Sequence, residues 1–133
     1  MSDNPISLKQ AAYRSGLAIS LFRFISEKTK NECTTDLNNL IALASGINQE
    51  VHHALLKYSP TPLTLRLLSY IKHRRPVPLT QAMHLTGLGI SLYEVILDQA
   101  SKDCSTESHD MLSLACDINQ EVYRALLAVI YDE

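Results

Sequence analysis

The sequence INQEV at residues 47–51 occurs a second time at residues 118–122, and the two copies are 71 residues apart. The same offset aligns residues 5–59 with residues 76–130 without a gap, and 22 of the 55 aligned positions are identical. A match of this length without insertions indicates an internal duplication. The chain must therefore fold into a structure that accommodates two copies of one unit.

Each unit has the hydrophobic pattern of two helices joined by a short loop. In the first unit, Ser7 and Gln10 have the spacing of a capping box. Apolar residues then recur every three or four positions, on two faces, as far as about Lys30. Residues 32–36 form a loop that ends in good N-cap residues, and a second helix is expected at 37–58. The corresponding helices of the second unit are expected at 79–101 and 107–131, and no segment has the pattern of a strand.

The chain is therefore predicted to be an all-α single domain, with repeat unit one at 5–59 and repeat unit two at 76–130. One αα-hairpin cannot cover all the apolar faces of its helices. The two tandem hairpins are expected to pack about a pseudo-twofold axis as a four-helix bundle. Residues 60–75 have no copy in the first unit and begin with Thr61-Pro62, which favours a short linking helix.

The charge is distributed unevenly, although the net charge is only −2. Residues 1–75 carry a net charge of +5, and residues 76–133 carry −7. The two halves should attract each other within a chain or between chains, so a homo-oligomer is one expectation. No apolar run reaches the ~20 residues of a membrane span, and the first residues lack a leader pattern. We predict no membrane contact and a cytoplasmic location.

The cysteines do not resemble a secreted disulfide framework, because they are three in number and widely spaced. Cys33 and Cys104 occupy aligned loop positions and are expected to be free thiols that fill small spaces beneath the turns. Cys104, His109 and Cys116 cluster in the sequence, but they lack the spacing of metal ligands. No triad spacing or phosphate loop is present. We predict no metal, no cofactor, no catalytic residue and no enzymatic activity.

The repeated polar triad has two interpretations. Its six members are Asn48, Gln49, Glu50, Asn119, Gln120 and Glu121. In the structural interpretation, the amides form hydrogen bonds across the pseudo-twofold axis or cap the facing loop. In the functional interpretation, the six residues form a doubled recognition patch for a protein partner. Acid–base chemistry by Glu50 and Glu121 would need a substrate pocket, and nothing near them in the sequence marks one.

Residues 10–17 and 81–88 resemble the first helix and glycine turn of DNA-binding helix-turn-helix units, over about 20 residues per copy. This resemblance implies that Gly16 and Gly87 mark turns. The alternative is that each lies in a continuous helix that another helix approaches closely. The residues that would contact nucleic acid are Arg14, Arg23, Lys72, Arg74 and Arg75. The segments that would correspond to the recognition helices, 18–23 and 89–94, have few side chains that could bind base edges or phosphates.

The apolar excess is the positive indication of function. Helices that are apolar on two faces leave more hydrophobic surface than one bundle core needs, which favours a partner groove. We therefore predict a small, non-enzymatic intracellular regulator or adaptor that binds a protein partner through helical faces. The alternative is a DNA-binding transcriptional regulator, whose affinity for DNA would fall steeply with salt.

Overall fold

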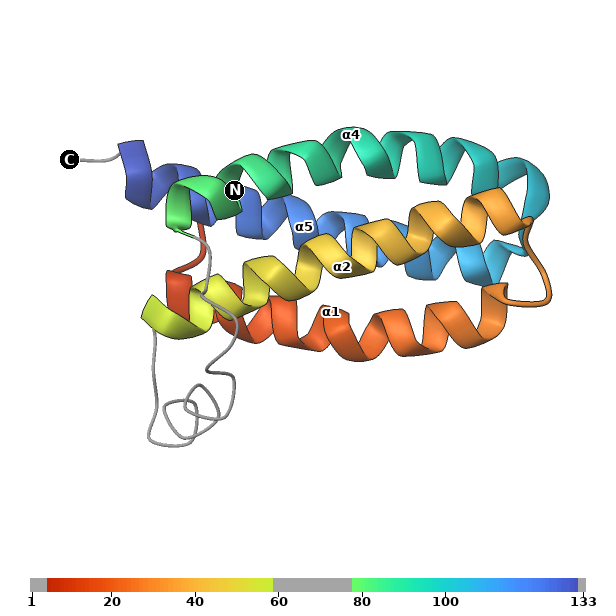
Figure 1. Ribbon diagram of the computed structural model, residues 1–133, viewed down its shortest axis with the longest axis horizontal. Helices are drawn as coiled ribbons and strands as arrows, with labels where there is room; N and C mark the ends of the chain where they lie inside the picture. Colours follow the sequence, from red (N-terminus) through yellow and green to blue (C-terminus); the bar gives the residue numbers. More distant parts are fainter. Residues whose placement is uncertain (1–4, 59–77, 132–133) are drawn as a thin grey trace.

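A computed structural model of the protein describes residues 5–58 and 78–131. It contains the helices α1 (Leu8–Thr29), α2 (Thr35–Tyr58), α4 (Leu79–Asp103) and α5 (Thr106–Tyr131), and no strand within those two ranges. The four helices run along one long axis (Figure 1). The linking helix predicted for 60–75 lies outside the described residues, as do Lys72, Arg74 and Arg75.

The helix ends follow from local capping. Ser7 Oγ accepts the backbone N–H of Gln10 at 3.1 Å, and the Gln10 side chain accepts the backbone N–H of Ser7 at 3.1 Å, which confirms the predicted capping box. α2 begins at Thr35, earlier than the predicted residue 37, because the Thr34 hydroxyl accepts the N–H of Leu37 at 3.2 Å. Ser105 caps α5 in the same way, through the N–H of Ser108 at 3.2 Å.

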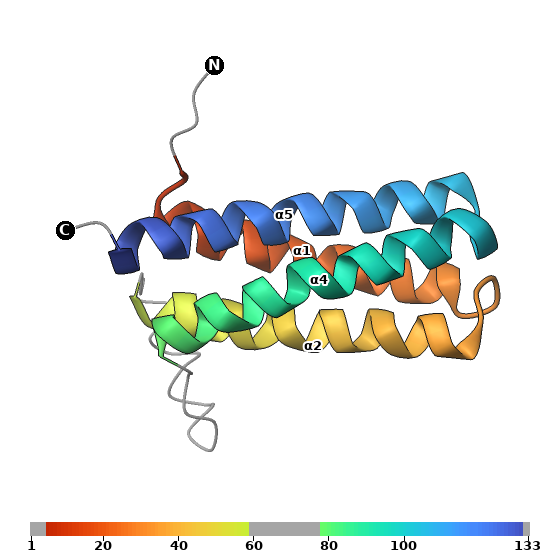
Figure 2. The ribbon, with the colours of Figure 1, turned by 90° about the horizontal axis from the view of Figure 1, so that it is seen from above.

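The helices lie at the corners of a square. α1 packs against α2 and α5, and α4 packs against the same two helices, so α1 lies diagonally opposite α4 (Figures 1 and 2). The loops that join α1 to α2 and α4 to α5 lie at one end of the bundle. The start of α1 and the end of α5 lie at the other end (Figure 2). The predicted all-α class and the four-helix bundle are confirmed.

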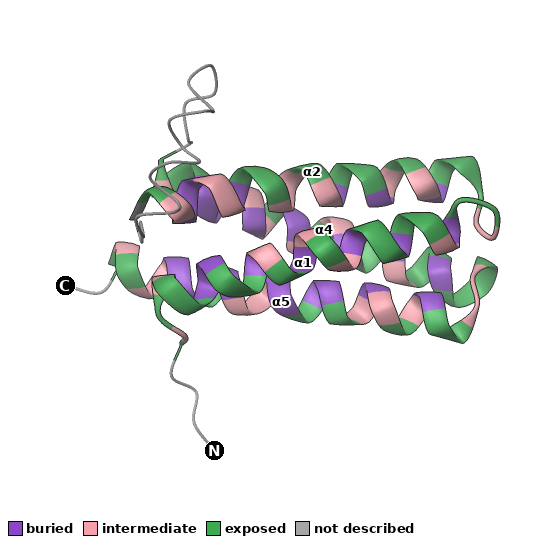
Figure 3. Ribbon diagram, turned by 90° about the horizontal axis from the view of Figure 1, so that it is seen from below, coloured by how far each residue is buried: buried purple, intermediate pink, exposed green. Residues whose placement is uncertain are grey.

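The core consists of two clusters, and each cluster takes side chains from all four helices. One lies toward the start of α1 and includes Val51, Leu55, Val122, Leu126 and several alanines. The other lies toward the two loops and includes Phe22, Ile25, Ile41, Tyr93, Ile96 and Leu112. The buried residues form a stripe on the inner side of each helix (Figure 3). None of the described helices has the length and apolarity needed to cross a membrane.

Gly16 and Gly87 lie inside the continuous helices α1 and α4, and no described glycine has a positive φ. The continuous-helix interpretation is confirmed, and the turn implied by the helix-turn-helix resemblance does not form at either glycine. A side chain, and not a helix backbone, approaches each glycine most closely. A Cβ on Gly16 would lie 3.1 Å from Cε1 of His52, and one on Gly87 would lie 3.4 Å from Cε1 of Tyr123.

Two other glycines give a prediction about stability. Gly46→Ala is expected to raise the free energy of unfolding by up to ~1 kcal/mol, because helix propensity favours alanine and nothing lies within 4 Å of the added Cβ. Gly89→Ala is expected to lower the free energy of unfolding below that of wild type. Its Cβ would lie 3.1 Å from Nδ2 of Asn119, a buried amide that donates to the backbone oxygen of Thr86 at 3.0 Å. Thermal unfolding measures both effects, and an equal gain in both variants would contradict this account.

Candidate functional site

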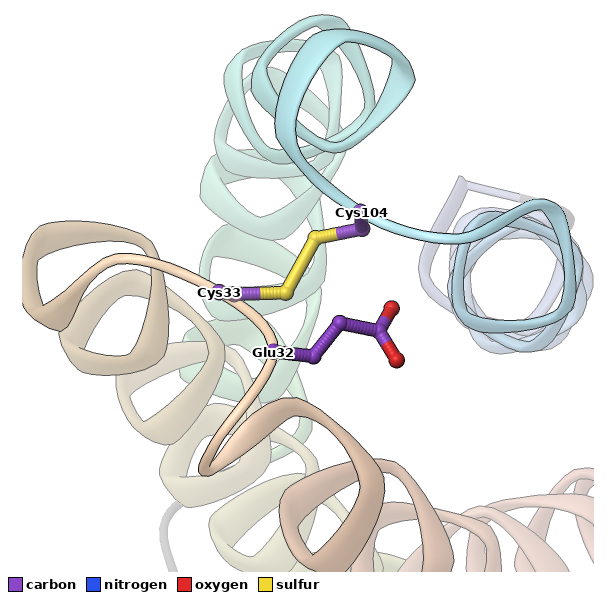
Figure 4. Close-up of side chains that lie close together, drawn as sticks. All are labelled: Glu32, Cys33 and Cys104. Carbon is purple, nitrogen blue, oxygen red and sulfur yellow. A yellow bond between two sulfur atoms is a disulfide. The ribbon is translucent and has the colours of Figure 1, made fainter.

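A disulfide joins the two loops at one end of the bundle. Cys33 lies between α1 and α2, Cys104 follows α4, and their Cα atoms are 5.7 Å apart (Figure 4). The prediction that these cysteines are separate free thiols is therefore wrong. The two loops lie side by side at one end of the bundle, so aligned positions of the two units come together. Among the described cysteines only Cys116 is free, and burial raises the pKa of its thiol.

Glu32 crosses from the first loop to the start of α5. Its carboxylate accepts the backbone N–H of Ser105 at 2.6 Å, and it points toward the segment after Cys104 (Figure 4). Lys28 Nζ lies 3.9 Å from Glu32 and 3.7 Å from Glu107. The backbone N–H of Ser105, the hydroxyls of Ser105 and Ser108, and the charge of Lys28 lower the pKa of Glu32 from 4.5 to about 2.

This pKa shift gives a prediction about pH. The ionised form of Glu32 is favoured in the folded state, so its stabilising contribution is complete above pH 4.5 and is lost as the pH falls toward about 2. In acid titrations followed by circular dichroism, wild type should lose more stability over this range than Glu32→Gln. Parallel stability curves for the two proteins would show that Glu32 does not hold the loops together.

The ligand atoms of Glu32, Cys33 and Cys104 lie within 4.8 Å of one another, and this is the one such group that the described residues form. A metal site would need deprotonated thiols, and these two sulfurs are bonded to each other. The Glu32 carboxylate already accepts the N–H of Ser105. The cluster is therefore a structural link between the two loops. The absence of a metal stays a prediction.

The asparagines of the repeated triad connect helices within each hairpin. Asn48 Nδ2 donates to the backbone oxygen of Ser15 at 3.0 Å, which joins α2 to α1. Asn119 Nδ2 donates to the backbone oxygen of Thr86 at 3.0 Å, which joins α5 to α4. Asn119 is only 9% exposed. The asparagines are thus hydrogen-bonded, but to the other helix of their own hairpin, so the predicted bonds across the pseudo-twofold axis or to the facing loop are not the ones these residues make.

The remaining four residues of the triad point in different directions. Gln120 donates to Cys116 Sγ at 3.7 Å within α5, and Glu121 pairs at 3.2 Å with Arg14 of α1. Gln49 and Arg23 line one shallow depression between α1 and α2. Glu50 lies on the side of α2 that faces α4. The structure therefore does not bring the six predicted residues together into one patch. Their role in partner binding stays a prediction.

Ser15 and His52 form a partly buried polar contact between α1 and α2. Ser15 Oγ lies 2.8 Å from His52 Nδ1 and donates to the backbone oxygen of Ala12 at 3.0 Å. Burial, together with the charge of His53, lowers the pKa of His52. Since Ser15 is completely buried, no substrate reaches its hydroxyl. The pair holds two helices together.

An open apolar groove of about 550 Å³ lies between α2 and α4. Leu43 and Leu88 on its two sides are 56% and 63% exposed. Gly46 leaves its floor open, because it has no side chain and nothing lies within 4 Å of where a Cβ would be. The residues that line it are Ala42, Leu43, Gly46, Ile47, Glu50, Leu85, Leu88 and Leu92.

Apart from Glu50, sequence reasoning did not single out the groove residues. Leu85, Leu88 and Leu92 have the spacing that places side chains on one side of a helix. This second apolar face of α4 was the available signal. This face could be recognised as one side of a groove only once α4 was known to pack beside α2, where Gly46 lies between Leu43 and Ile47.

Comparison of the chain with protein-family models, with curated proteins and with solved structures finds no match. The function is therefore inferred from the chain's own residues.

Proposed function

We propose that the protein is a non-enzymatic helical adaptor or regulator that binds a protein partner through the groove between α2 and α4. The supporting observation is that two large apolar side chains, Leu43 and Leu88, are more than half exposed on its two sides. Covering such surface contributes about 25 cal/mol per Å² of apolar area removed from water. An apolar groove between two helices suits the apolar face of a third helix.

The placement of the polar groups supports binding over catalysis. Glu50 lies in the α2–α4 groove, whereas Glu121 pairs with Arg14 of α1, so the two carboxylates do not share a site. Ser15 and His52 lie at a helix contact where the hydroxyl is buried. The contacts of Glu121, Ser15 and His52 join helices of the bundle, and the groove is left as exposed surface that the core does not use.

We also infer that the two hairpins are copies of one unit related by an approximate twofold axis. The 71-residue offset that aligns the sequences also relates Cys33 to Cys104, the two ends of the disulfide. The bonds made by Asn48 and Asn119 both span 33 residues and join the two helices of one hairpin. A duplicated hairpin gives the bundle two related faces, α1 with α5 and α2 with α4.

Affinity capture with paired variants tests the proposed function. Leu88→Glu places a charge in the groove, and Leu17→Glu places one at the aligned position of α1, which is 46% exposed. Proteins that wild type and Leu17→Glu both recover at moderate salt should be lost with Leu88→Glu, once circular dichroism shows that both variants are folded. Equal recovery by the two variants would contradict binding through this groove. Recovery of DNA that disappears steeply with salt would favour the DNA-binding alternative.

A further inference from the structure

The two related faces of the bundle differ in one pair of positions. On the α1–α5 face, Arg14 Nη1 lies 3.2 Å from Glu121 Oε1. On the α2–α4 face, the aligned positions are Leu85 and Glu50, and both line the groove. The acid is thus present on both faces, whereas its cation is present on only one. Leucine takes the place of arginine where the groove is open.

Among the described residues that line the groove, Glu50 is the one that carries a charge, and none is a lysine or arginine. No ion pair reaches Glu50 within residues 5–58 and 78–131. The groove therefore combines an apolar surface with an acidic group that has no counter-charge among the described residues, and it is complementary to an apolar surface that carries a cation.

We propose that the groove binds an amphipathic helix of a partner protein, with apolar residues that recur every three or four positions and a lysine or arginine that pairs with Glu50. This inference rests on the proposed function. A helix fits because Leu85, Leu88 and Leu92 on one side and Leu43 and Ile47 on the other have helical spacing, which forms ridges between which a third helix can pack. The lysine or arginine of the partner would form an ion pair with Glu50, as Arg14 does with Glu121 on the other face.

The same charge disfavours a second copy of the chain as the occupant. Two α2–α4 grooves packed face to face would bring two Glu50 carboxylates to one interface without a cation from the groove lining. Like charges that face each other across an interface are destabilising. A partner helix with a basic residue avoids this repulsion.

The test is a titration with a labelled synthetic peptide of about 20 residues, long enough to form a helix, built of leucines at helical spacing with lysines on the flanks. The full chain is expected to bind it, and Glu50→Lys should weaken binding about fivefold to tenfold at low salt. Glu94→Lys, an exposed site on α4 outside the groove lining, makes the same change of charge and should leave the affinity within about twofold of wild type. An otherwise identical peptide with glutamates in place of lysines should bind Glu50→Lys better than wild type.

The outcomes separate this inference from the proposed function. If Leu88→Glu abolishes binding but Glu50→Lys leaves the affinity unchanged, the groove binds helices whatever their charge. The proposed function then holds, and the pairing of a cation with Glu50 is overturned. If none of these variants changes the affinity, both are overturned. A wild-type dimer in sedimentation that the peptide dissociates would show that a second copy occupies the groove, which also overturns the inference.

Discussion

Reduction of the Cys33–Cys104 disulfide is expected to lower the free energy of unfolding by about 4 kcal/mol. The bond joins residues 71 positions apart and so restricts the unfolded chain strongly. It is also a covalent link between the two hairpins at the loop end of the bundle (Figure 4). Urea unfolding with and without a reductant measures the loss directly.

Two variants control this experiment. The double variant Cys33→Ser, Cys104→Ser should show the same loss as reduced wild type and no further response to the reductant. Cys116→Ala should keep the full response, because Cys116 is the free thiol among the described cysteines. An unfolding midpoint of wild type that is the same with and without reductant would show that the two loops do not depend on the bond.

Ile25→Ala and Ile96→Ala are each expected to lower the free energy of unfolding by about 2–5 kcal/mol. Both side chains are 0% exposed, both belong to the core cluster near the loops, and they occupy aligned positions of the two units. Each truncation removes buried apolar atoms and leaves a cavity that neighbouring side chains from several helices cannot fill fully. Chemical unfolding of the two variants measures the loss of stability caused by the truncation in each hairpin.

Leu88→Ala is the control for these core substitutions. Because Leu88 is 63% exposed, its truncation is expected to change stability by no more than ~0.5 kcal/mol. A loss as large as that of Ile96→Ala would show that Leu88 belongs to the core. The α2–α4 groove would then be filled in the folded protein and unable to accept a partner.

The fold was predictable because its signals are local. Apolar spacing and the Ser7–Gln10 capping box depend on residues within a few turns of one another, and both located helices correctly to within a few positions. The start of α2 was missed because Thr34, Thr35 and Asp36 are all acceptable caps. Hydrogen bonding in the structure selects Thr34.

The candidate site was less predictable because it depends on which helices lie side by side. Consecutive residues of a helix point about 100° apart, so Asn48, Gln49 and Glu50 could not share one face. Asn48 accordingly contacts α1, and Glu50 faces α4. The disulfide follows from the packing of the hairpins, which no single segment encodes.

Methyl NMR of the full chain measures directly whether the α2–α4 groove is the binding surface. On addition of the leucine–lysine peptide, we expect the signals of Leu43, Ile47, Leu85, Leu88 and Leu92 to shift. Those of Leu17 and Leu114, at the positions of the α1–α5 face aligned with Leu88 and Leu43, should remain in place. Shifts confined to Leu17 and Leu114, or spread equally over both faces, would show that the peptide does not bind specifically in the α2–α4 groove.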